Sequence, residues 1–184
     1  GEILFVSHSA DPSEAVQKTN DYMTAYGDTD CIYATGEDYI TPAADVIKSR
    51  GITDCKIYGS NISPSVCQLI MDGQVEACTG GEFVCGSLAV TLLINYLDGN
   101  PIKDADGTAP YFDNLTQFMV TAENAEDFYE FLSDENLATH TISDEEYQNL
   151  LVRNNPDVDY DYFYDFLTNY EENVYAKVEA NAAQ

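Results

Sequence analysis

Positive charge is scarce in this sequence of 184 residues. Seven lysine and arginine residues stand against 33 aspartate and glutamate residues, so the formal net charge is -26 at pH 7. A chain this acidic repels the phosphates of nucleic acids and the surfaces of anionic membranes. We therefore expect no nucleic-acid partner.

Long apolar runs are absent as well. A membrane-spanning helix needs about 20 consecutive apolar residues, whereas Thr91 and Asn95 interrupt the longest apolar stretch, Leu88–Leu97. The first residues lead into a strand-like run and lack the basic start and apolar core of a signal peptide. We expect a chain that is soluble as given, with any targeting segment absent or removed.

Cysteine shows no metal-binding spacing. The five cysteines form no CxxC or CxxH pair, and their number is odd. Cys31, Cys55 and Cys78 fall in predicted core strands, where a thiol packs as a small apolar group. We expect free structural thiols, with one disulfide between neighbouring strands as the alternative. We expect no metal site and no cofactor.

Signatures of common enzyme classes are missing too. The sequence has no GxSxG nucleophile elbow, no phosphate-binding loop ending in Gly-Lys and no GxGxxG after a strand. Its two histidines fall in predicted loops. His8 follows the first strand and could contact a ligand, whereas we expect His140 to be solvated. No catalytic residue is predicted from these patterns.

A repeated alternation of strand and helix organises residues 30–73. The short apolar runs Cys31–Ala34 and Cys55–Tyr58 each precede a helical pattern. Two parallel strands joined by a helix form a right-handed crossover unit. The pattern therefore predicts an α/β fold with a parallel sheet flanked by helices.

Helix starts and stops are marked by capping residues. Asp11-Pro12, Thr41-Pro42 and Ser63-Pro64 each place a capping side chain before a proline, which predicts three helix starts. Glycine at 27, 51 and 73 predicts where these helices stop.

Further runs complete the predicted fold. Ile3–Val6 is predicted as a buried strand, and Val75–Thr79 and Leu115–Thr121 as two more. Gly86–Leu97 reads as a helix that is apolar on nearly all faces. Such a helix must be covered on more than one side.

The last 52 residues change in character. Ser143 and Glu146 form a capping-box pattern, and apolar residues from Tyr160 to Val178 recur at helical spacing over about five turns. We expect an α/β domain over residues 1–132 and an acidic, tyrosine-rich helical extension over residues 133–184.

The candidate site lies where the predicted strands end. Ligands of parallel sheets bind beyond the carboxyl ends of the strands. The turns there carry Glu37, Asp38 and Glu82, whose carboxylates can bind hydroxyls or cations, or act as paired acid and base. Tyr39 and Phe83 add aromatic surface for a small polar ligand.

The order of these motifs resembles the carboxyl-terminal half of type I periplasmic binding proteins, a family shared with LacI-type repressor cores. The resembling segments are residues 30–38, 44–51, 57–61, 70–77 and 86–99. The resemblance implies two lobes that close on a ligand by hinge motion. It also implies that this chain starts partway into the second lobe.

The resemblance extends the set of expected ligand residues. It adds Ser9, Asp11 and Asn61 to the five residues above, and it places the hinge at Gly80 and Gly81. The chain departs from the family pattern at Gly36, where sugar binders usually carry Asn, and at Asn61, where they carry Asp.

The leading expectation is a sugar-binding or similar solute-binding domain of an ABC-type uptake system, without enzymatic turnover. It would act with a membrane permease and lie outside the cytoplasmic membrane, anchored through a missing leader. The Gly86–Leu97 helix would be covered by the long tail helix or by a second copy of the chain. The alternatives are the ligand-sensing core of a LacI-type regulator, which would be cytoplasmic, and a small α/β enzyme with paired carboxylates.

Overall fold

The chain forms two compact units in the computed structural model, which describes residues 1–134 and 141–183. Unit 1 comprises Gly1–Gly80 and Met119–Glu130, and unit 2 comprises Gly81–Phe118 and Phe131–Gln184. The chain therefore passes between the units three times. His140, which we expected to be solvated, lies outside the described residues.

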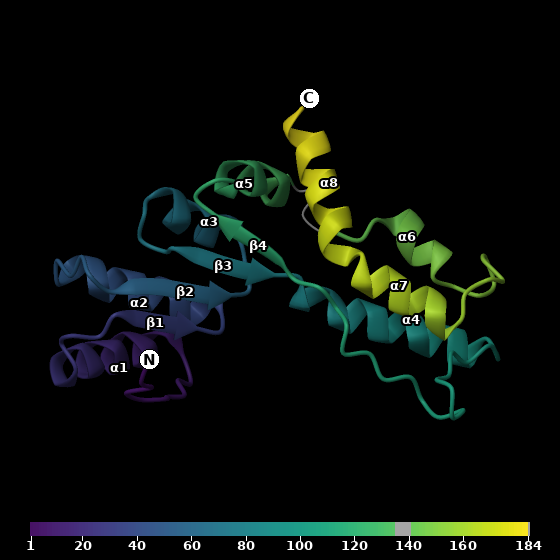
Figure 1. Ribbon diagram of the computed structural model, residues 1–184, viewed down its shortest axis with the longest axis horizontal. Helices are drawn as coiled ribbons and strands as arrows, with labels where there is room; N and C mark the ends of the chain where they lie inside the picture. The colour runs from purple at the N-terminus through teal and green to yellow at the C-terminus, as the bar shows by residue number, and fades with distance from the viewer. Residues whose placement is uncertain (135–140, 184) are drawn as a thin grey trace. The chain divides into compact units, whose positions relative to one another are not determined.

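Unit 1 is built on a four-stranded sheet with the order β1-β2-β3-β4. Its strands are β1 Cys31–Ala34, β2 Lys56–Ser60, β3 Ala77–Gly80 and β4 Phe118–Thr121. The first three strands are parallel, as predicted. β4 runs against the direction of β3 (Figure 1), so the complete sheet is mixed.

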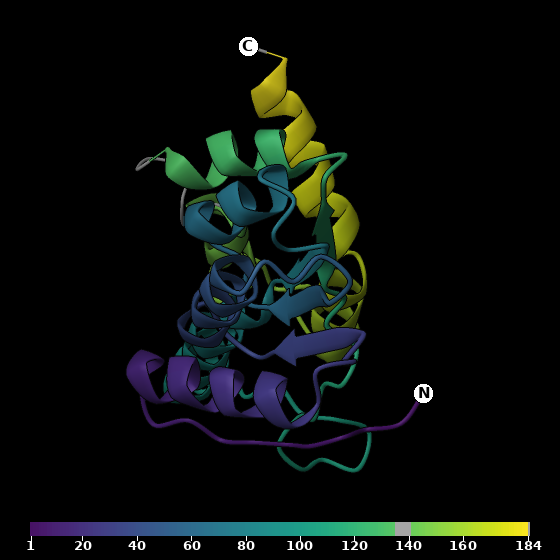
Figure 2. The same cartoon turned by 90° about the vertical axis from the view of Figure 1, so that its left-hand side faces the viewer.

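One face of this sheet is covered by helices α2 Glu37–Ser49 and α3 Pro64–Met71. Both crossovers step across the sheet in the same direction, so right-handed connections place both helices on one face, as Figure 2 shows. Ile40, Val66 and Ile57 are at most 1% exposed and form part of the core beneath them. The opposite face presents Tyr33, which is 62% exposed.

Local capping fixes two of the three predicted helix starts. The Asp11 carboxylate accepts a hydrogen bond from the Glu14 N–H at 2.9 Å and begins α1 Pro12–Ala25. The Ser63 hydroxyl accepts one from the Val66 N–H at 3.3 Å and begins α3. A cap that satisfies an otherwise unpaired N–H stabilises a helix by about 1 kcal/mol.

The third predicted start, at Thr41-Pro42, is wrong. Helix α2 begins at Glu37, and Pro42 lies inside it. The Gly36 carbonyl accepts hydrogen bonds from the N–H groups of Tyr39 and Ile40, each at 2.9 Å. Burial of Ile40 and its neighbours outweighs the one intrahelical bond that proline cannot make.

The predicted strand Ile3–Val6 is also wrong. These residues adopt no regular structure, and Ile3 and Val6 are 80% and 87% exposed. Phe5 alone finds an aromatic partner, since its ring stacks on that of Tyr22 in α1 with 3.6 Å between centroids. An apolar run forms a strand only where a neighbouring strand pairs with its backbone. The sheet ends at β1, so residues 3–6 have no such partner there.

Unit 2 is helical. It contains the single turn η1 Glu82–Val84 and the helices α4 Cys85–Leu97, α6 Asp144–Asn149, α7 Tyr160–Thr168 and α8 Tyr170–Ala182. Helix α5 Ala125–Ser133 begins in unit 1 and ends in unit 2. The predicted capping box of α6 is confirmed, with Ser143 and Glu146 bonded reciprocally.

The predicted five-turn helix of the tail is divided into two, α7 and α8, at Asn169. Thr116 compensates for the backbone bonds lost at this break. Its hydroxyl lies within hydrogen-bond distance of the Leu167 and Thr168 carbonyls, at 3.3 and 3.2 Å, and accepts the Glu171 N–H at 3.0 Å. Thr116 is distant in sequence from the tail. The helical spacing of the tail's apolar residues therefore could not reveal the break at Asn169.

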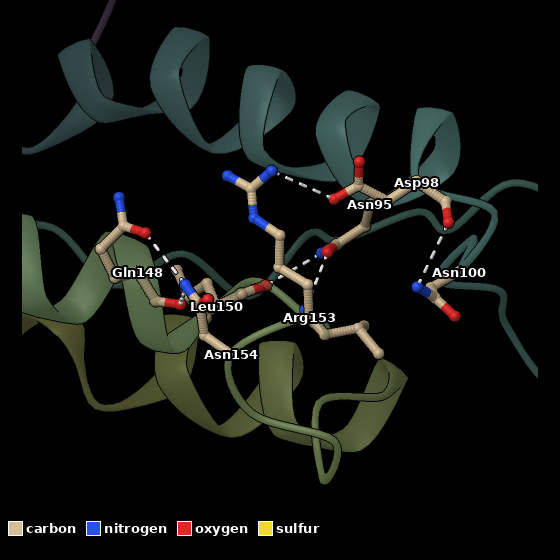
Figure 3. Close-up of polar contacts among 8 residues, drawn as sticks. Asn95, Asp98, Asn100, Gln148, Leu150, Arg153 and Asn154 are labelled. Atoms are coloured by element: carbon tan, nitrogen blue, oxygen red, sulfur yellow. Dashed lines mark hydrogen bonds and ion pairs between the residues drawn. The ribbon is translucent and has the colours of Figure 1, made fainter.

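Asn95 joins the tail to α4, as Figure 3 shows. Its side chain is fully buried, donates to the Leu150 carbonyl at 2.9 Å and accepts the Val152 N–H at 2.9 Å. Beside it, Arg153 pairs with Asp98 at 3.4 Å. The tail therefore packs on this helix through residues 150–153, which precede the long tail helix that we expected as its cover.

The cover is incomplete, which corrects the prediction that α4 is buried on more than one side. Val90, Leu93, Tyr96 and Leu97 are 53% to 72% exposed. These four side chains form the exposed α4 face. The tail covers the side of α4 that carries Leu88, Thr91 and Asn95, all of which are buried.

No disulfide links any of the five cysteines, all of which lie within residues 1–134. Cys55, Cys67 and Cys78 are buried, and burial raises the pKa of the Cys67 thiol to about 12. Cys31 is exposed, contrary to its predicted place in the core, because it lies on β1, the edge strand of the sheet. Within residues 1–134 and 141–183, no helix is long and apolar enough to cross a membrane.

Candidate functional site

The carboxyl ends of the three parallel strands lie at one edge of the sheet in unit 1. Ala34 at the end of β1 is paired with Gly59, and Gly59 is paired with Cys78. The segments that leave this edge are Thr35–Asp38 after β1 and Asn61–Ser63 after β2. The structure therefore brings Glu37, Asp38 and Asn61 to the same sheet edge.

Glu37 and Asp38 form the first turn of α2 instead of the expected turn before it. Carboxylates at a helix N-terminus are stabilised by the positive end of the helix dipole. Asp38 is exposed and Glu37 half-buried. Their oxygens can accept hydrogen bonds from the hydroxyl groups of a ligand.

Asn61 has a left-handed backbone conformation with φ of +76°. Among the residues that the structure describes, it is the one non-glycine residue with positive φ. Asparagine adopts this conformation more readily than most residues, and such conformations are concentrated at binding sites. The side chain is exposed directly beyond the end of β2.

Tyr39, Ser9 and Asp11 also belong to unit 1, and they have structural partners. The Tyr39 hydroxyl donates to the Ser9 carbonyl at 3.1 Å and so fastens the N-terminal segment to α2. Asp11 caps α1 through one carboxylate oxygen. His8 is exposed, and its carbonyl accepts a hydrogen bond from the Lys18 ammonium.

Glu82 and Phe83 lie in unit 2, on the single turn η1. Phe83 is 43% exposed. Both carboxylate oxygens of Glu82 are buried and have no hydrogen-bond partner among the described residues. The expected hinge residues fall on either side of the unit boundary, since Gly80 ends β3 in unit 1 and Gly81 begins unit 2.

The surface cavities of the described residues lie away from the expected ligand residues. Two surface cavities of about 350 and 290 Å³ lie in unit 2 on residues near Ile102, and neither is lined by an expected ligand residue. No group of three or more His, Cys, Asp or Glu side chains in residues 1–134 and 141–183 could hold a metal ion.

Residues 2–101 match the family described as "Periplasmic binding protein domain". This match covers more than half of the chain, and the chain therefore belongs to that family. It also contains the strands β1 to β3 and the segments that leave their carboxyl edge. No curated protein matches the chain.

Solved structures of sugar-binding proteins share the fold. The arabinose-binding component of an ABC transporter from Shewanella sp. ANA-3 has a TM-score of 0.56 at 19% identity, over 70% of this chain and 42% of that one. A periplasmic sugar-binding protein from Pseudomonas fluorescens has a TM-score of 0.59 at 18% identity, over 83% and 45%.

A third similar structure is a solute-binding protein of an ABC transporter from Agrobacterium vitis with bound D-fucose. It has a TM-score of 0.57 at 18% identity, over 74% of this chain and 43% of that one. The likeness to these three structures establishes the fold. The matched part of this chain spans less than half the length of each of them.

Proposed function

We propose that this chain binds a small sugar or sugar-like solute for an ABC-type uptake system and does not turn it over. The ligand contacts are Glu37, Asp38 and Asn61 at the carboxyl edge of the sheet, with Ser9, Asp11 and Tyr39 beside α1 and α2. Glu82 and Phe83 in unit 2 remain further proposed ligand residues, and Gly80 and Gly81 the proposed hinge.

The convergence of polar side chains at one sheet edge is the observation that carries this proposal. Carboxylates and an amide can hydrogen-bond sugar hydroxyls without any reacting group nearby. The segments that supply them lie within the matched family region, residues 2–101. Similar structures bind arabinose and D-fucose, and these sugars are the first candidates for this chain.

A thermal-shift screen tests the proposal. The chain is heated with L-arabinose, D-fucose, D-allose or D-galactose in separate samples. The concentration of each sugar is raised to about 100 times its Kd, for Kd values in the micromolar to millimolar range. A specific ligand at 100 times its Kd stabilises the folded state by about 2.7 kcal/mol. We expect at least one sugar to raise Tm in a saturable manner.

Paired variants localise the effect. Asp38→Asn should weaken binding at the sheet edge, whereas Asp45→Asn changes an exposed carboxylate further along the same helix and should leave binding intact. The proposal is wrong if none of the four sugars shifts Tm. Equal loss of binding in both variants would contradict the location of the site.

Membership of this family supports further proposals about the whole protein. The partner is a membrane permease, and the protein lies in the periplasm or outside the cell, attached through a leader. The exposed α4 face, on the helix predicted at Gly86–Leu97, fits a homodimer contact, which light scattering can test. We also retain the division into a binding-protein domain over residues 1–132 and a helical extension over residues 133–184.

A further inference from the structure

Helix α4 carries no charged side chain along its whole length. None of its 13 residues is Asp, Glu, Lys or Arg, although these types make up 22% of the chain. The other α-helices that lie wholly in unit 2, α6, α7 and α8, all begin with acidic residues in their first turn. An exposed helix face without charge is unusual, because the solvent-facing side of a surface helix is ordinarily polar.

The exposed α4 face extends to the start of the helix through Gly86 and Ala89, which are also exposed. Successive members of the extended row are one to four residues apart, and Gly86, Val90, Leu93 and Leu97 follow the spacing four, three, four that keeps side chains on one side of a helix. The face is therefore a continuous apolar row. Contiguous exposed apolar surface of this kind marks interaction sites.

A hollow in the surface adjoins this row. Leu93 and Tyr96 belong to both, since they line the cavity of about 290 Å³ together with Leu92, Pro101 and Pro110. Helices pack when the side chains of one enter the hollows beside the side chains of the other. The row and the cavity next to it therefore offer a surface on which a second helix can pack.

The size of the side chains changes along the row. Gly86 and Ala89 lie near the N-terminal end of α4, and a Cβ at Gly86 would have no atom within 4 Å. Tyr96 and Leu97 lie at the C-terminal end and are 65% and 72% exposed. When two such helices pack antiparallel, the large end of each lies over the small end of the other. Parallel packing would instead set the large ends against each other.

Charge favours the same arrangement. Each copy of the chain has a formal charge of -26, so an uncharged surface is where two copies can meet without opposing carboxylates. Asp98 follows the C-terminal end of the row, and Arg153 pairs with it at 3.4 Å (Figure 3). In an antiparallel pair this end lies beside the N-terminus of the other α4, where the helix dipole is positive. The contact is therefore electrostatically self-complementary.

We propose that two copies of this chain associate through α4, with the two helices packed antiparallel about a two-fold axis. This inference rests on the homodimer contact included in the proposed function, and it specifies the symmetry and the orientation of that contact. A two-fold contact uses the same surface of both copies. Val90 of each copy then faces Leu93 of the other, and none of the residues proposed at the sheet edge takes part.

Sedimentation equilibrium of the full chain provides the first test, between about 1 and 100 μM protein. We expect a mass of twice 20.4 kDa. Leu93→Glu brings two carboxylates into the centre of the contact and should weaken association at least about 100-fold. The matched control is Val16→Glu, which changes an exposed side chain of α1 and should remain dimeric. A monomeric wild type, or equal association of both variants, overturns the inference.

Cross-linking with a short bismaleimide tests the orientation and does not depend on the folding of Leu93→Glu. Cys85 is an exposed thiol on the same side of α4 as Tyr96, about three turns away. Antiparallel packing brings position 96 of one copy beside Cys85 of the other. In a Cys31→Ser background, Tyr96→Cys should therefore form a covalent dimer, and the further change Cys85→Ser should abolish it. A covalent dimer that persists without Cys85 overturns the inference, because parallel packing sets position 96 against itself.

Salt separates an apolar contact from one held by ion pairs. The dimer should tighten by about tenfold between 10 mM and 0.5 M NaCl, since salt screens the repulsion between the two acidic copies. Weaker association at high salt overturns the inference. The sugar screen above is scored independently: a monomer that binds a sugar overturns only this inference, and an α4-linked dimer that binds none of the sugars overturns only the proposed solute binding.

Discussion

Gly59 controls the distance between α2 and the sheet. A Cβ at this position would lie 2.4 Å from Cδ1 of Ile40 and 3.1 Å from the Ala34 carbonyl oxygen. Ile40 is fully buried, so its side chain has little room to move away. The same helix carries Glu37 and Asp38, and its close approach to β2 therefore positions two of the three residues proposed at the sheet edge.

Gly59→Ala should destabilise the chain by about 1–3 kcal/mol, because the added methyl group overpacks the contact between α2 and β2. Urea unfolding at pH 7 measures the change. The control is Gly86→Ala in α4, where nothing lies within 4 Å of the added Cβ. That variant should gain up to about 1 kcal/mol. Equal stability of the Gly59→Ala variant and the wild type would contradict the close packing.

For single residues, the sequence predicted position better than surroundings. The place of Glu37, Asp38 and Asn61 beyond the ends of β1 and β2 could be predicted, since each follows a strand whose pattern was clear. The environments of Gly81 and Tyr170 could not be predicted. A Cβ at Gly81 would lie 2.9 Å from Cε1 of Tyr170, but the two residues are far apart in sequence and nothing local indicates that they meet.

Between elements, an ion pair fastens α8 to α6. The Lys177 ammonium donates to the Glu146 carboxylate and to the Thr141 carbonyl, the latter at 3.0 Å. Burial acts to raise the pKa of Glu146, but hydrogen bonds from Lys177 and Ser143 outweigh it and leave the pKa below the ordinary value of 4.5. The folded state therefore favours the ionised form.

This shift predicts how stability depends on pH. A carboxylate with a lowered pKa contributes its full stabilisation above pH 4.5, and the contribution is lost as the pH falls through the folded-state pKa. Glu146→Gln should cost about 1 kcal/mol at pH 7, since the pair is partly solvated. The difference from the wild type should shrink as the pH falls below 4.5. Urea unfolding at pH 7 and at successively lower pH values measures it, and a constant difference would contradict the assignment.

Helix boundaries show why local signals succeed or fail. The starts at Pro12 and Pro64 were predicted correctly because a capping side chain satisfies the first N–H groups there. The start of α2 was misplaced because its first turn is held by a backbone carbonyl and by the burial of Ile40. The break at Asn169 depends on Thr116, so it required the tertiary structure.

Across the whole molecule, the formal charge of -26 acts against compactness. Like charges on a folded surface repel one another, and salt screens this repulsion over about 10 Å at 0.1 M. We expect Tm at pH 7 to rise by a few degrees between 10 mM and 0.5 M NaCl. The effect should shrink near the pI of about 4.1. A salt-independent Tm at pH 7 would contradict this account.

The global fold was the most predictable feature of unit 1. Alternating strands and helices with short connections allow few arrangements other than a parallel sheet with right-handed crossovers. Unit 2 was less predictable, because α4 comes from residues 81–118 and the tail from residues 131–184, and these segments meet only in the folded state. The apolar composition of α4 alone could not indicate which of its sides remains exposed.

The three passages of the chain between the units also limit how the protein can be dissected. A chain that stops after residue 130 retains unit 1 together with residues 81–118 of unit 2, so truncation alone yields neither unit by itself. Isolating unit 1 requires an internal deletion that joins Gly80 to Met119, which connects β3 directly to the neighbouring strand β4. Cleavage by a protease at any one position would leave at least one of the units in two pieces.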